Sequence, residues 1–285
     1  MTKIERLGVV GGGQMGGGIA EVSARAGIDV IVCEVNDAVA RAGRNKLWKS
    51  LNRAVQNGKI NEAERDEAQS RLHFTTTLAD LDDREMVVEA IAENEEQKLK
   101  LFAELDKLVD PAAILASNTS SIPIAKIAAA TKRPKQVLGV HFFNPVPVLK
   151  LVELVPSLLT AEETVQRAAE FATEQLGKET ILAKDRSGFV VNALLVPYLL
   201  SAIRMLESGF ATAEDIDKGM VLGCAHPMGP LRLADLVGLD TLKAIADSMY
   251  AEYAEPTYAA PPLLQRMLEA GQKGKKSGKG FFTYS

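Results

Sequence analysis

The chain has 285 residues, of which 47% are hydrophobic and 25% charged, which is typical of a globular protein and argues against disorder or a fibrous structure. Its length exceeds the typical domain of about 100 to 200 residues, so we expect two domains. The 33 basic and 37 acidic residues give a net charge of −4, which argues against nucleic acid or an anionic membrane as a partner.

The two cysteines, Cys33 and Cys224, lie far apart and show no metal-ligand spacing, which favours free thiols in a reducing compartment. The first residues lead directly into a strand and glycines, without the pattern of a signal peptide. No stretch approaches about 18 uninterrupted apolar residues. We therefore expect a cytoplasmic protein without a membrane span or a metal site.

The first part of the chain alternates strand and helix patterns. The run IERLGVV precedes a glycine-opened helix over 14–25, and DVIVCE follows as a second strand, which together form a βαβ unit. The charge-rich stretch 37–71 predicts a pair of helices broken near Asn57 and Gly58, projecting from the sheet.

Alternation then resumes with strands that are apolar on both faces, as a buried parallel sheet requires. The predicted strands are MVVEAI, AAILASN, QVLGVHFF, LKLVELV and KETILAK, and the predicted helices cover 95–108, a short segment near Ile124, and 161–176.

From Ser187 onward only helix signals remain, and Thr212 with Asp215 predicts a capped helix start. The fold class is therefore α/β: a Rossmann-like, mostly parallel sheet domain over 1–184, with the helical pair inserted near 37–71, followed by a smaller all-helical domain over 185–285.

The sequence VGGGQMGGG, between a strand and a helix, matches a dinucleotide-binding fingerprint at Gly11, Gly13 and Gly16, with Gln14 and Met15 between the glycines. The first glycine permits a tight turn, the second lets the backbone approach a pyrophosphate, and the third lets the helix pack on the strand. The alternative is a glycine-rich turn that binds nothing.

Glu34 ends the second strand about 20 residues further on, where a carboxylate can accept hydrogen bonds from an adenosine ribose. Its charge would repel the 2′-phosphate of NADP, and no arginine stands at 35–40 to offset it. This favours NAD over NADP.

His141 lies where a predicted strand ends and the chain turns through Asn144-Pro145, and such strand ends line the ligand crevice of α/β sheets. Glu153 lies twelve residues later among apolar residues, where a buried carboxylate needs a partner. If the turn brings the next strand back alongside, Glu153 would raise the basicity of His141 and fix its tautomer, giving a general base. A lone histidine is, however, more often a structural residue.

Two further polar features remain open. The stretch SNTSSI, 117–122, follows a strand, so its side chains reach the same rim, or it caps the helix near Ile124. Asn192 is polar within an apolar helix pattern, and it either bonds within an interdomain contact or faces the cleft.

Together these segments resemble the short-chain L-3-hydroxyacyl-CoA dehydrogenase family, in particular its bacterial 3-hydroxybutyryl-CoA dehydrogenases. The matching pieces extend in order over nearly the whole chain: GGGQMGGGIA, VVEAIAEN, ASNTSSI, HFFNPVPVLKLVE, GFVVNALLVPYL, PMGPL, VGLD and GKKSGKGFF.

The resemblance implies that His141 is the catalytic base, that Glu153 is its partner, and that Ser120 and Asn192 hold the hydroxyl and carbonyl region of the substrate. It places Glu34, Glu93, Lys98, Asn118, Asn144 and Lys276 at cofactor-contacting positions. The alternative for Glu93 and Lys98 is a solvated helix start, and for Lys276 a mobile tail.

In the family, the helical pair contacts coenzyme A. Here it carries Lys46, Lys49, Ser50 and Arg53 along one helical face; Ser50 fits the family pattern, whereas Asn57 stands where relatives commonly have lysine. A charged, solvated face is the alternative.

The implied reaction is reversible oxidation of a 3-hydroxyacyl-CoA to the 3-oxoacyl-CoA, with hydride transfer to NAD, in a homodimer formed by the helical domain. Two other hypotheses remain: a related dehydrogenase of a free hydroxy or sugar acid, and a non-catalytic NAD-binding redox sensor.

Overall fold

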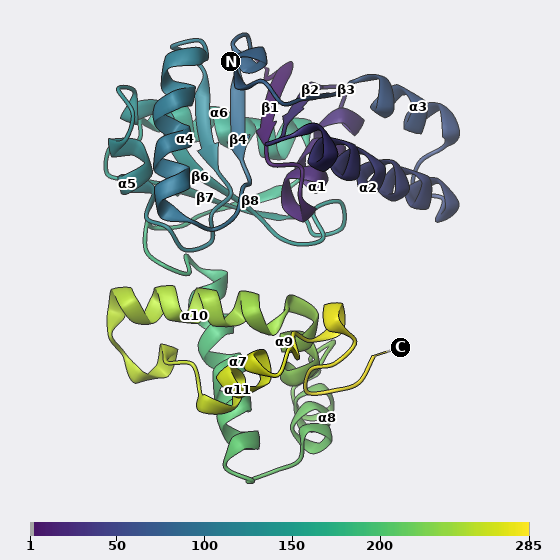
Figure 1. Cartoon of the computed structure of the whole chain (residues 1–285), viewed down its shortest axis with the longest axis vertical. Coiled ribbons are helices and arrows are strands. Elements are labelled where there is room, and N and C mark those ends of the chain that lie inside the picture. The colour runs from purple at the N-terminus through teal and green to yellow at the C-terminus, as the bar shows by residue number, and fades with distance from the viewer. Residues whose placement is uncertain (1–2, 285) are drawn as a thin grey trace. The chain divides into compact units, whose positions relative to one another are not determined.

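The computed structural model describes residues 3–284, and they form two units whose boundary lies between Asp185 and Arg186 (Figure 1). Each unit has its own hydrophobic core. The first unit is α/β and the second is helical, which confirms the predicted fold class.

The α/β unit contains one eight-stranded sheet with the order β3-β2-β1-β4-β5-β6-β7-β8. Neighbouring strands are parallel except for the antiparallel pair β6 and β7. The strands are β1 Arg6–Val10, β2 Asp29–Cys33, β3 Leu72–Thr75, β4 Met86–Glu89, β5 Ile114–Ser117, β6 Val137–Phe142, β7 Leu151–Pro156 and β8 Glu179–Leu182.

Helices cover both faces of this sheet (Figure 1). They are α1 Gln14–Arg25, α2 Asp37–Gln56, α3 Glu62–Ser70, α4 Glu95–Leu108, α5 Ile124–Ala129 and α6 Glu162–Glu170, with short 3-10 turns at Leu78–Leu81 and Pro134–Gln136. One core joins Ile19 of α1 and Ala168 of α6 to alternate residues of the central strands. All residues of β4, β5 and β6 are buried, as expected for strands covered on both sides.

The helical pair is present as α2 and α3, separated by residues 57–61. Asn61 caps α3 through two reciprocal hydrogen bonds. Its side chain accepts a hydrogen bond from the Glu64 amide, and the Glu64 carboxylate accepts one from the Asn61 amide. The structure also corrects two details. The short edge strand β3 was not predicted, and the helix predicted over 161–176 changes at Phe171–Gln175 into a π-helical turn.

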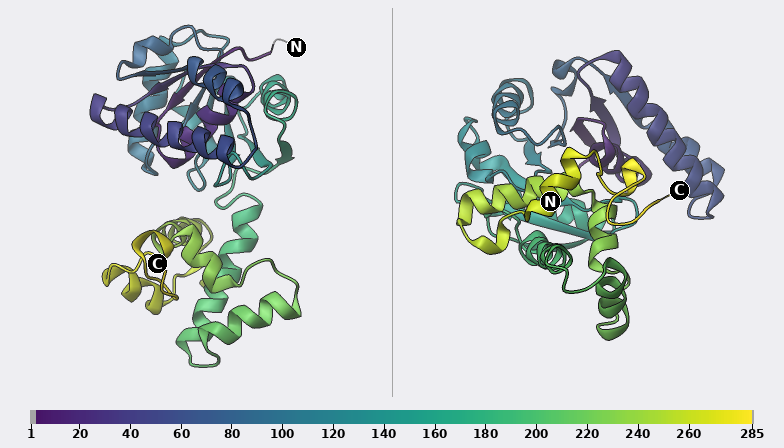
Figure 2. Two further views of the ribbon diagram at one scale, coloured as in Figure 1. Left: turned by 90° about the vertical axis from the view of Figure 1, so that its right-hand side faces the viewer. Right: turned by 60° about the horizontal axis from the view of Figure 1, so that its bottom comes forward.

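The second unit consists of the helices α7 Val191–Glu207, α8 Ala213–Gly223, α9 Pro230–Val237, α10 Leu239–Tyr253 and α11 Pro262–Glu269, with 3-10 turns at Pro256–Tyr258 and Lys275–Ser277 (Figure 2). The predicted cap is confirmed, because the Thr212 hydroxyl accepts from the amide of Asp215 at 3.1 Å. Buried Asp235 anchors the last residues by accepting from the amides of Phe281 and Phe282. No helix in the described part is long and apolar enough to span a bilayer.

Candidate active site

The glycine loop connects the end of β1 to the first turn of α1. Gly11 has a φ of +93°, and a Cβ there would lie 2.7 Å from the carbonyl oxygen of Ala90. A Cβ at Gly16 would lie 1.8 Å from the carbonyl oxygen of Gly11, so any larger residue would push the helix off the loop.

Gly13 lies in a different environment. No heavy atom is within 4 Å of the position its Cβ would take, and α1 begins there without a side-chain cap. The first amides of α1 are therefore available to an anion, which the helix dipole would also favour. These features fit a dinucleotide pyrophosphate.

The carboxylate of Glu34 lies beside this loop, at the end of β2. Its Oε1 accepts from the amide of Gly12 at 2.6 Å, and this bond fixes the position of the carboxylate beside the loop. A carboxylate accepts several hydrogen bonds, so Glu34 retains capacity for the hydroxyls of a ribose. The geometry fits the role predicted for it.

A second contact joins the glycine loop to the segment after β6. The side-chain amide of Gln14 donates to Oδ1 of Asn144 at 3.0 Å, and a Cβ at Gly18 would lie 2.8 Å from Cβ of Val146. The residues that follow His141 therefore pack against α1, and the predicted cofactor positions Gln14 and Asn144 lie together.

His141 and Glu153 are direct partners in the antiparallel register of β6 and β7. Nδ1 of His141 lies 2.7 Å from Oε2 of Glu153, and the two residues are 6% and 0% exposed. The ring of Phe143 lies against the imidazole, with 4.6 Å between centroids. Because Nδ1 faces the carboxylate, Nε2 is the nitrogen that would exchange a proton with a substrate.

The segment 117–122 forms the rim next to β6. Oδ1 of Asn118 accepts from the amide of Phe142 at 2.9 Å, which ties this rim to the strand that carries His141. The Ser120 hydroxyl forms no hydrogen bond with the described residues. The alternative role of helix cap is not supported, because Asp185 supplies the cap by accepting from the amides of Ile124 and Ala125.

Beneath this rim lies a buried ionic network. Nζ of Lys98 lies 2.6 Å from Glu89 and 3.1 Å from Glu93, and Glu89 also accepts from the Ser117 hydroxyl at 2.6 Å. Lys98 is 1% exposed, so the alternative of a solvated helix start is wrong for it.

Glu93 is the part of this network nearest to solvent, with a side chain 34% exposed. Its Oε1 accepts hydrogen bonds from the Ser120 amide at 3.1 Å and from the Ser121 hydroxyl at 3.0 Å. Burial acts to raise the pKa of Glu93, but Lys98 and the hydroxyl donors outweigh it and hold the pKa below its usual value. Glu93 is therefore a fixed anion under the Ser120 loop.

The remaining predicted residues lie on α2 and in the helical unit. Lys46, Lys49 and Arg53 are exposed and Ser50 is half-buried. In the helical unit, Asn192 is buried in α7. Lys276 pairs with Asp240 at 2.5 Å, so this lysine is held by an ion pair.

The buried carboxylate Glu89 was missed by the sequence reasoning. It lies within the strand MVVEAI, where a charged residue surrounded by apolar neighbours signals an internal partner. That signal was present, but the partner is a lysine nine residues away on a helix whose sequence is rich in charged residues.

Fold and loop geometry together define an α/β protein that binds a nicotinamide dinucleotide. The family model for the NAD-binding domain of 3-hydroxyacyl-CoA dehydrogenase matches residues 6–186, and the model for the C-terminal domain matches 188–284. The chain belongs to the 3-hydroxyacyl-CoA dehydrogenase family, and its cofactor is NAD.

Relatives resemble the chain over its whole length. A 3-hydroxybutyryl-CoA dehydrogenase of Mycobacterium tuberculosis is 66% identical over 282 residues, covering 99% of each chain. The crystal structure of M. tuberculosis FadB2 matches with a TM-score of 0.99, 65% identity and complete coverage of both chains. The (S)-3-hydroxybutyryl-CoA dehydrogenase PaaH1 from Ralstonia eutropha matches with a TM-score of 0.93 and 43% identity, covering 99% of this chain and 100% of that one.

Proposed function

We propose that the chain catalyses the reversible, NAD-dependent oxidation of an (S)-3-hydroxyacyl-CoA, with 3-hydroxybutyryl-CoA as a substrate, to the 3-oxoacyl-CoA. The observation that carries the proposal is the 2.7 Å contact between His141 Nδ1 and Glu153 Oε2. The pair lies at the strand ends that also carry the glycine loop and the Asn118 rim. The names of the full-length relatives support the choice of substrate.

His141 is the proton acceptor in this mechanism. During oxidation its Nε2 takes the proton of the 3-hydroxyl group, and the negative charge of Glu153 stabilises the imidazolium that results. In the reverse direction the same nitrogen returns the proton to the oxygen at C3. Ser120 and Asn192 orient the hydroxyl and carbonyl groups of the substrate.

When bound, NAD would supply the redox chemistry, as the acceptor for the hydride from C3. The chain holds its pyrophosphate at Gly11, Gly13 and Gly16, with Gln14 and Met15 beside it, and its adenosine ribose at Glu34. The other residues proposed to hold NAD are Glu93, Asn118, Asn144 and Lys276. Lys98 acts indirectly by fixing Glu93, because its own ammonium is buried between two carboxylates.

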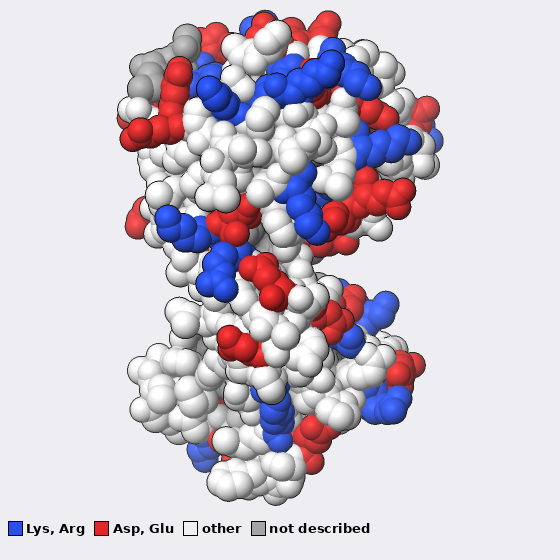
Figure 3. Space-filling model, turned by 90° about the vertical axis from the view of Figure 1, so that its left-hand side faces the viewer, with Lys and Arg blue, Asp and Glu red and all other residues white. Residues whose placement is uncertain are grey.

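The proposal includes a homodimer formed through the helical unit. That unit exposes large apolar side chains, among them Leu194, Phe210 and Leu222, each more than two-thirds exposed. Figure 3 shows a wide area without charged side chains on one face of this unit, as an interface between subunits would require. The two cysteines are free thiols, which supports a cytoplasmic location.

Steady-state kinetics with purified protein tests this function. We expect NADH oxidation with acetoacetyl-CoA and little with acetoacetate, and we expect little NAD reduction with free sugar acids, because only the thioester carries coenzyme A. Higher kcat/KM with a free acid would identify the protein as a hydroxy-acid dehydrogenase instead. Binding of NADH without turnover of any of these substrates would favour a redox sensor.

A further inference from the structure

The order of the strands indicates which part of the sheet the nicotinamide half of the cofactor faces. Glu34, proposed to hold the adenosine ribose, follows β2, the glycine loop follows β1, and His141 lies on β6. The strands β4 and β5 lie between β1 and β6 in the sheet. Hydride transfer requires the nicotinamide to lie beside the carbon whose hydroxyl group loses its proton to His141. The nicotinamide half must therefore extend over the ends of β4 and β5, a placement that rests on the proposed function.

The strands β4 and β5 end at two buried polar side chains. Glu89 is the last residue of β4 and Ser117 the last residue of β5, and they are partners in the parallel register. Both are 0% exposed, and the Ser117 hydroxyl donates to Oε2 of Glu89 at 2.6 Å. Oε1 of Glu89 accepts from the amide of Ile91 at 2.8 Å and from the ammonium of Lys98 at 2.6 Å. Glu89 is thus a carboxylate enclosed by donors at the strand ends that the nicotinamide would cover.

The charges of this network are arranged from the interior toward solvent. Glu89 is 0% exposed and Lys98 is 1% exposed, whereas the side chain of Glu93 is 34% exposed. The ammonium of Lys98 lies 2.6 Å from Glu89 and 3.1 Å from Glu93, so its shorter contact is with the inner carboxylate. The outer carboxylate, which a ligand can approach, is therefore the less closely compensated of the two.

Two carboxylates share one ammonium, so the network carries one negative charge in excess. The other partners of Glu93 are the hydroxyls of Thr119 and Ser121 and the amide of Ser120. These groups are neutral, so they orient the carboxylate without cancelling its charge. A charge in a buried network is screened much less than one in water. The excess charge therefore acts on whatever lies over the ends of β4 and β5.

We propose that Glu89 shifts the relative affinity of the site toward the oxidised cofactor, NAD⁺, and away from NADH. The nicotinamide ring of NAD⁺ is positively charged and becomes neutral when it accepts a hydride, so a nearby negative charge stabilises the oxidised form selectively. Glu89 provides this selectivity by binding Lys98, because the ammonium would otherwise neutralise Glu93. It is a positioning residue, since it acts on the cofactor through Lys98 and Glu93.

Calorimetric titration of the full-length protein with NAD⁺ and with NADH tests the proposal. Glu89→Gln keeps an oxygen that can accept from Ile91 and Lys98, but it removes the excess charge. We expect the ratio of Kd for NAD⁺ to Kd for NADH to rise about threefold to tenfold, because NAD⁺ binds more weakly. An unchanged ratio, including equal weakening of both ligands, would show that Glu89 only supports the fold and would overturn the proposal.

A second variant, Glu93→Gln, removes the same unit of charge from the outer end of the network. Glu93 is also among the residues proposed to hold the cofactor, so both affinities can fall. The Kd ratio should nevertheless rise in the same direction as in Glu89→Gln, because both variants make the network neutral. An unchanged ratio in Glu93→Gln would overturn the proposal as well.

The matched control is Glu95→Gln, which changes a carboxylate in the first turn of α4. Its side chain is 45% exposed and pairs with Lys126, so solvent screens its charge. We expect its Kd ratio to stay within about twofold of that of the unmodified protein. A shift as large as that of Glu89→Gln would show that the effect does not come from the buried network.

Thermal unfolding checks that each variant folds, because Glu89 is buried. If Glu89→Gln does not fold, Glu93→Gln decides the outcome, since its partly exposed side chain tolerates the exchange. The titrations need no turnover, so their result is separate from the proposed activity. A shifted ratio without turnover of acetoacetyl-CoA would refute the proposed function while still placing the nicotinamide beside the network. Turnover with an unshifted ratio would support the proposed function and overturn the role of Glu89.

Discussion

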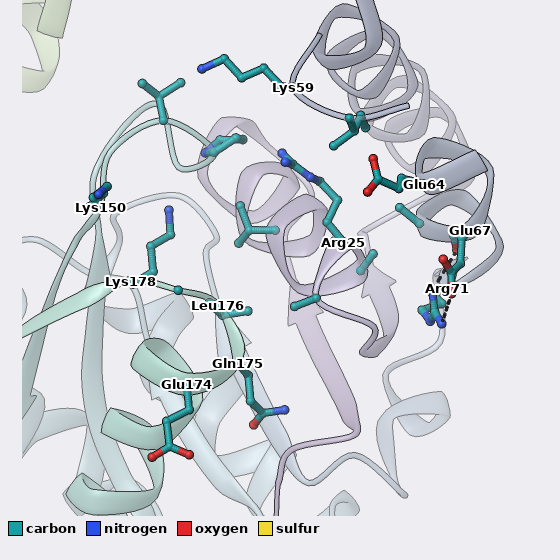
Figure 4. Close-up of a pocket in the computed structure, with 18 residues that line it drawn as sticks. Arg25, Lys59, Glu64, Glu67, Arg71, Lys150, Glu174, Gln175, Leu176 and Lys178 are labelled. Carbon is teal, nitrogen blue, oxygen red and sulfur yellow. Dashed lines mark hydrogen bonds and ion pairs between the residues drawn. The ribbon is translucent and has the colours of Figure 1, made fainter. Parts of the chain in front are cut away.

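Two polar regions of the α/β unit differ in how their charges are compensated. At the strand ends, His141 faces Glu153 and Lys98 lies between Glu89 and Glu93, so each charge has a partner within the protein. Lys59 and Lys150, which line a hollow of about 710 Å³ among α1, α3 and the segments before β7 and β8, have none among the described residues (Figure 4). Groups that perform chemistry need a fixed geometry before substrate arrives, and partners within the protein provide it, whereas a solvated cation keeps its conformational freedom.

Removing the proton acceptor would have the largest effect. His141→Ala should lower kcat with acetoacetyl-CoA by about 10² to 10⁴-fold, the usual contribution of a general base. NADH affinity, measured by fluorescence titration, should change little. The control His73→Ala removes an exposed histidine on β3 and should retain full activity. Full activity in His141→Ala would refute the acid-base role.

Removing the central cation of the buried network should mainly affect stability. Lys98→Met leaves Glu89 and Glu93 without their counter-charge, and we expect a loss of about 3 to 5 kcal/mol in the free energy of unfolding. Lys126→Met is the matched control, because Lys126 pairs with Glu95 at an exposed site, where such pairs contribute about 0 to 1 kcal/mol. Urea denaturation measures the free energy of unfolding of both variants. Equal losses would contradict the role of Lys98 as the counter-charge of Glu89 and Glu93.

Neutralising the partner of the histidine should have a moderate effect. Glu153→Gln keeps an oxygen that can accept from Nδ1 but removes the charge that stabilises the imidazolium, so we expect kcat to fall about 10 to 100-fold. Glu179→Gln, on the exposed edge strand β8, is the control. A kcat within twofold of the unmodified enzyme would show that the carboxylate only orients the ring.

We expect Glu34 to set the preference for NADH over NADPH. Glu34→Ala removes the carboxylate held by the Gly12 amide, and with it the repulsion of a 2′-phosphate. The ratio of kcat/KM for NADH over NADPH should narrow by about tenfold. A preference for NADPH in the unmodified protein would refute this interpretation of Glu34.

Local patterns were enough to predict the glycine loop and the contact between His141 and Glu153. Gly16 is required by its close contact with the Gly11 carbonyl within one strand-turn-helix unit, which a short motif encodes. The pairing of His141 with Glu153 followed from a turn between two strands that are adjacent in the sequence. In both cases the interacting residues lie within about a dozen positions of each other.

The buried network and the hollow could not be predicted in this way. Lys98 lies in the first turn of α4, a helix rich in charged residues, and its burial depends on how the rim packs over its side chain. The basic residues Arg25, Lys59, Lys150 and Lys178 around the hollow of Figure 4 come from α1, the turn between α2 and α3, and the segments before β7 and β8. No local pattern brings four such distant segments together.

The smallest expected effect concerns the acid sensitivity of the network. The folded-state pKa of Glu93 lies below the usual value for a glutamate, so its contribution to stability is complete above about pH 4.5 and is lost as the pH falls through the folded-state value. Glu93→Gln should therefore lower stability at pH 6 but reduce the further loss between about pH 5 and pH 3. Because Glu93 is partly exposed, we expect a difference of about 1 kcal/mol or less. Thermal unfolding of the unmodified protein and the variant at pH 6, 5 and 3 measures this difference. Parallel pH profiles for the two proteins would show that Glu93 is not held as an anion by Lys98.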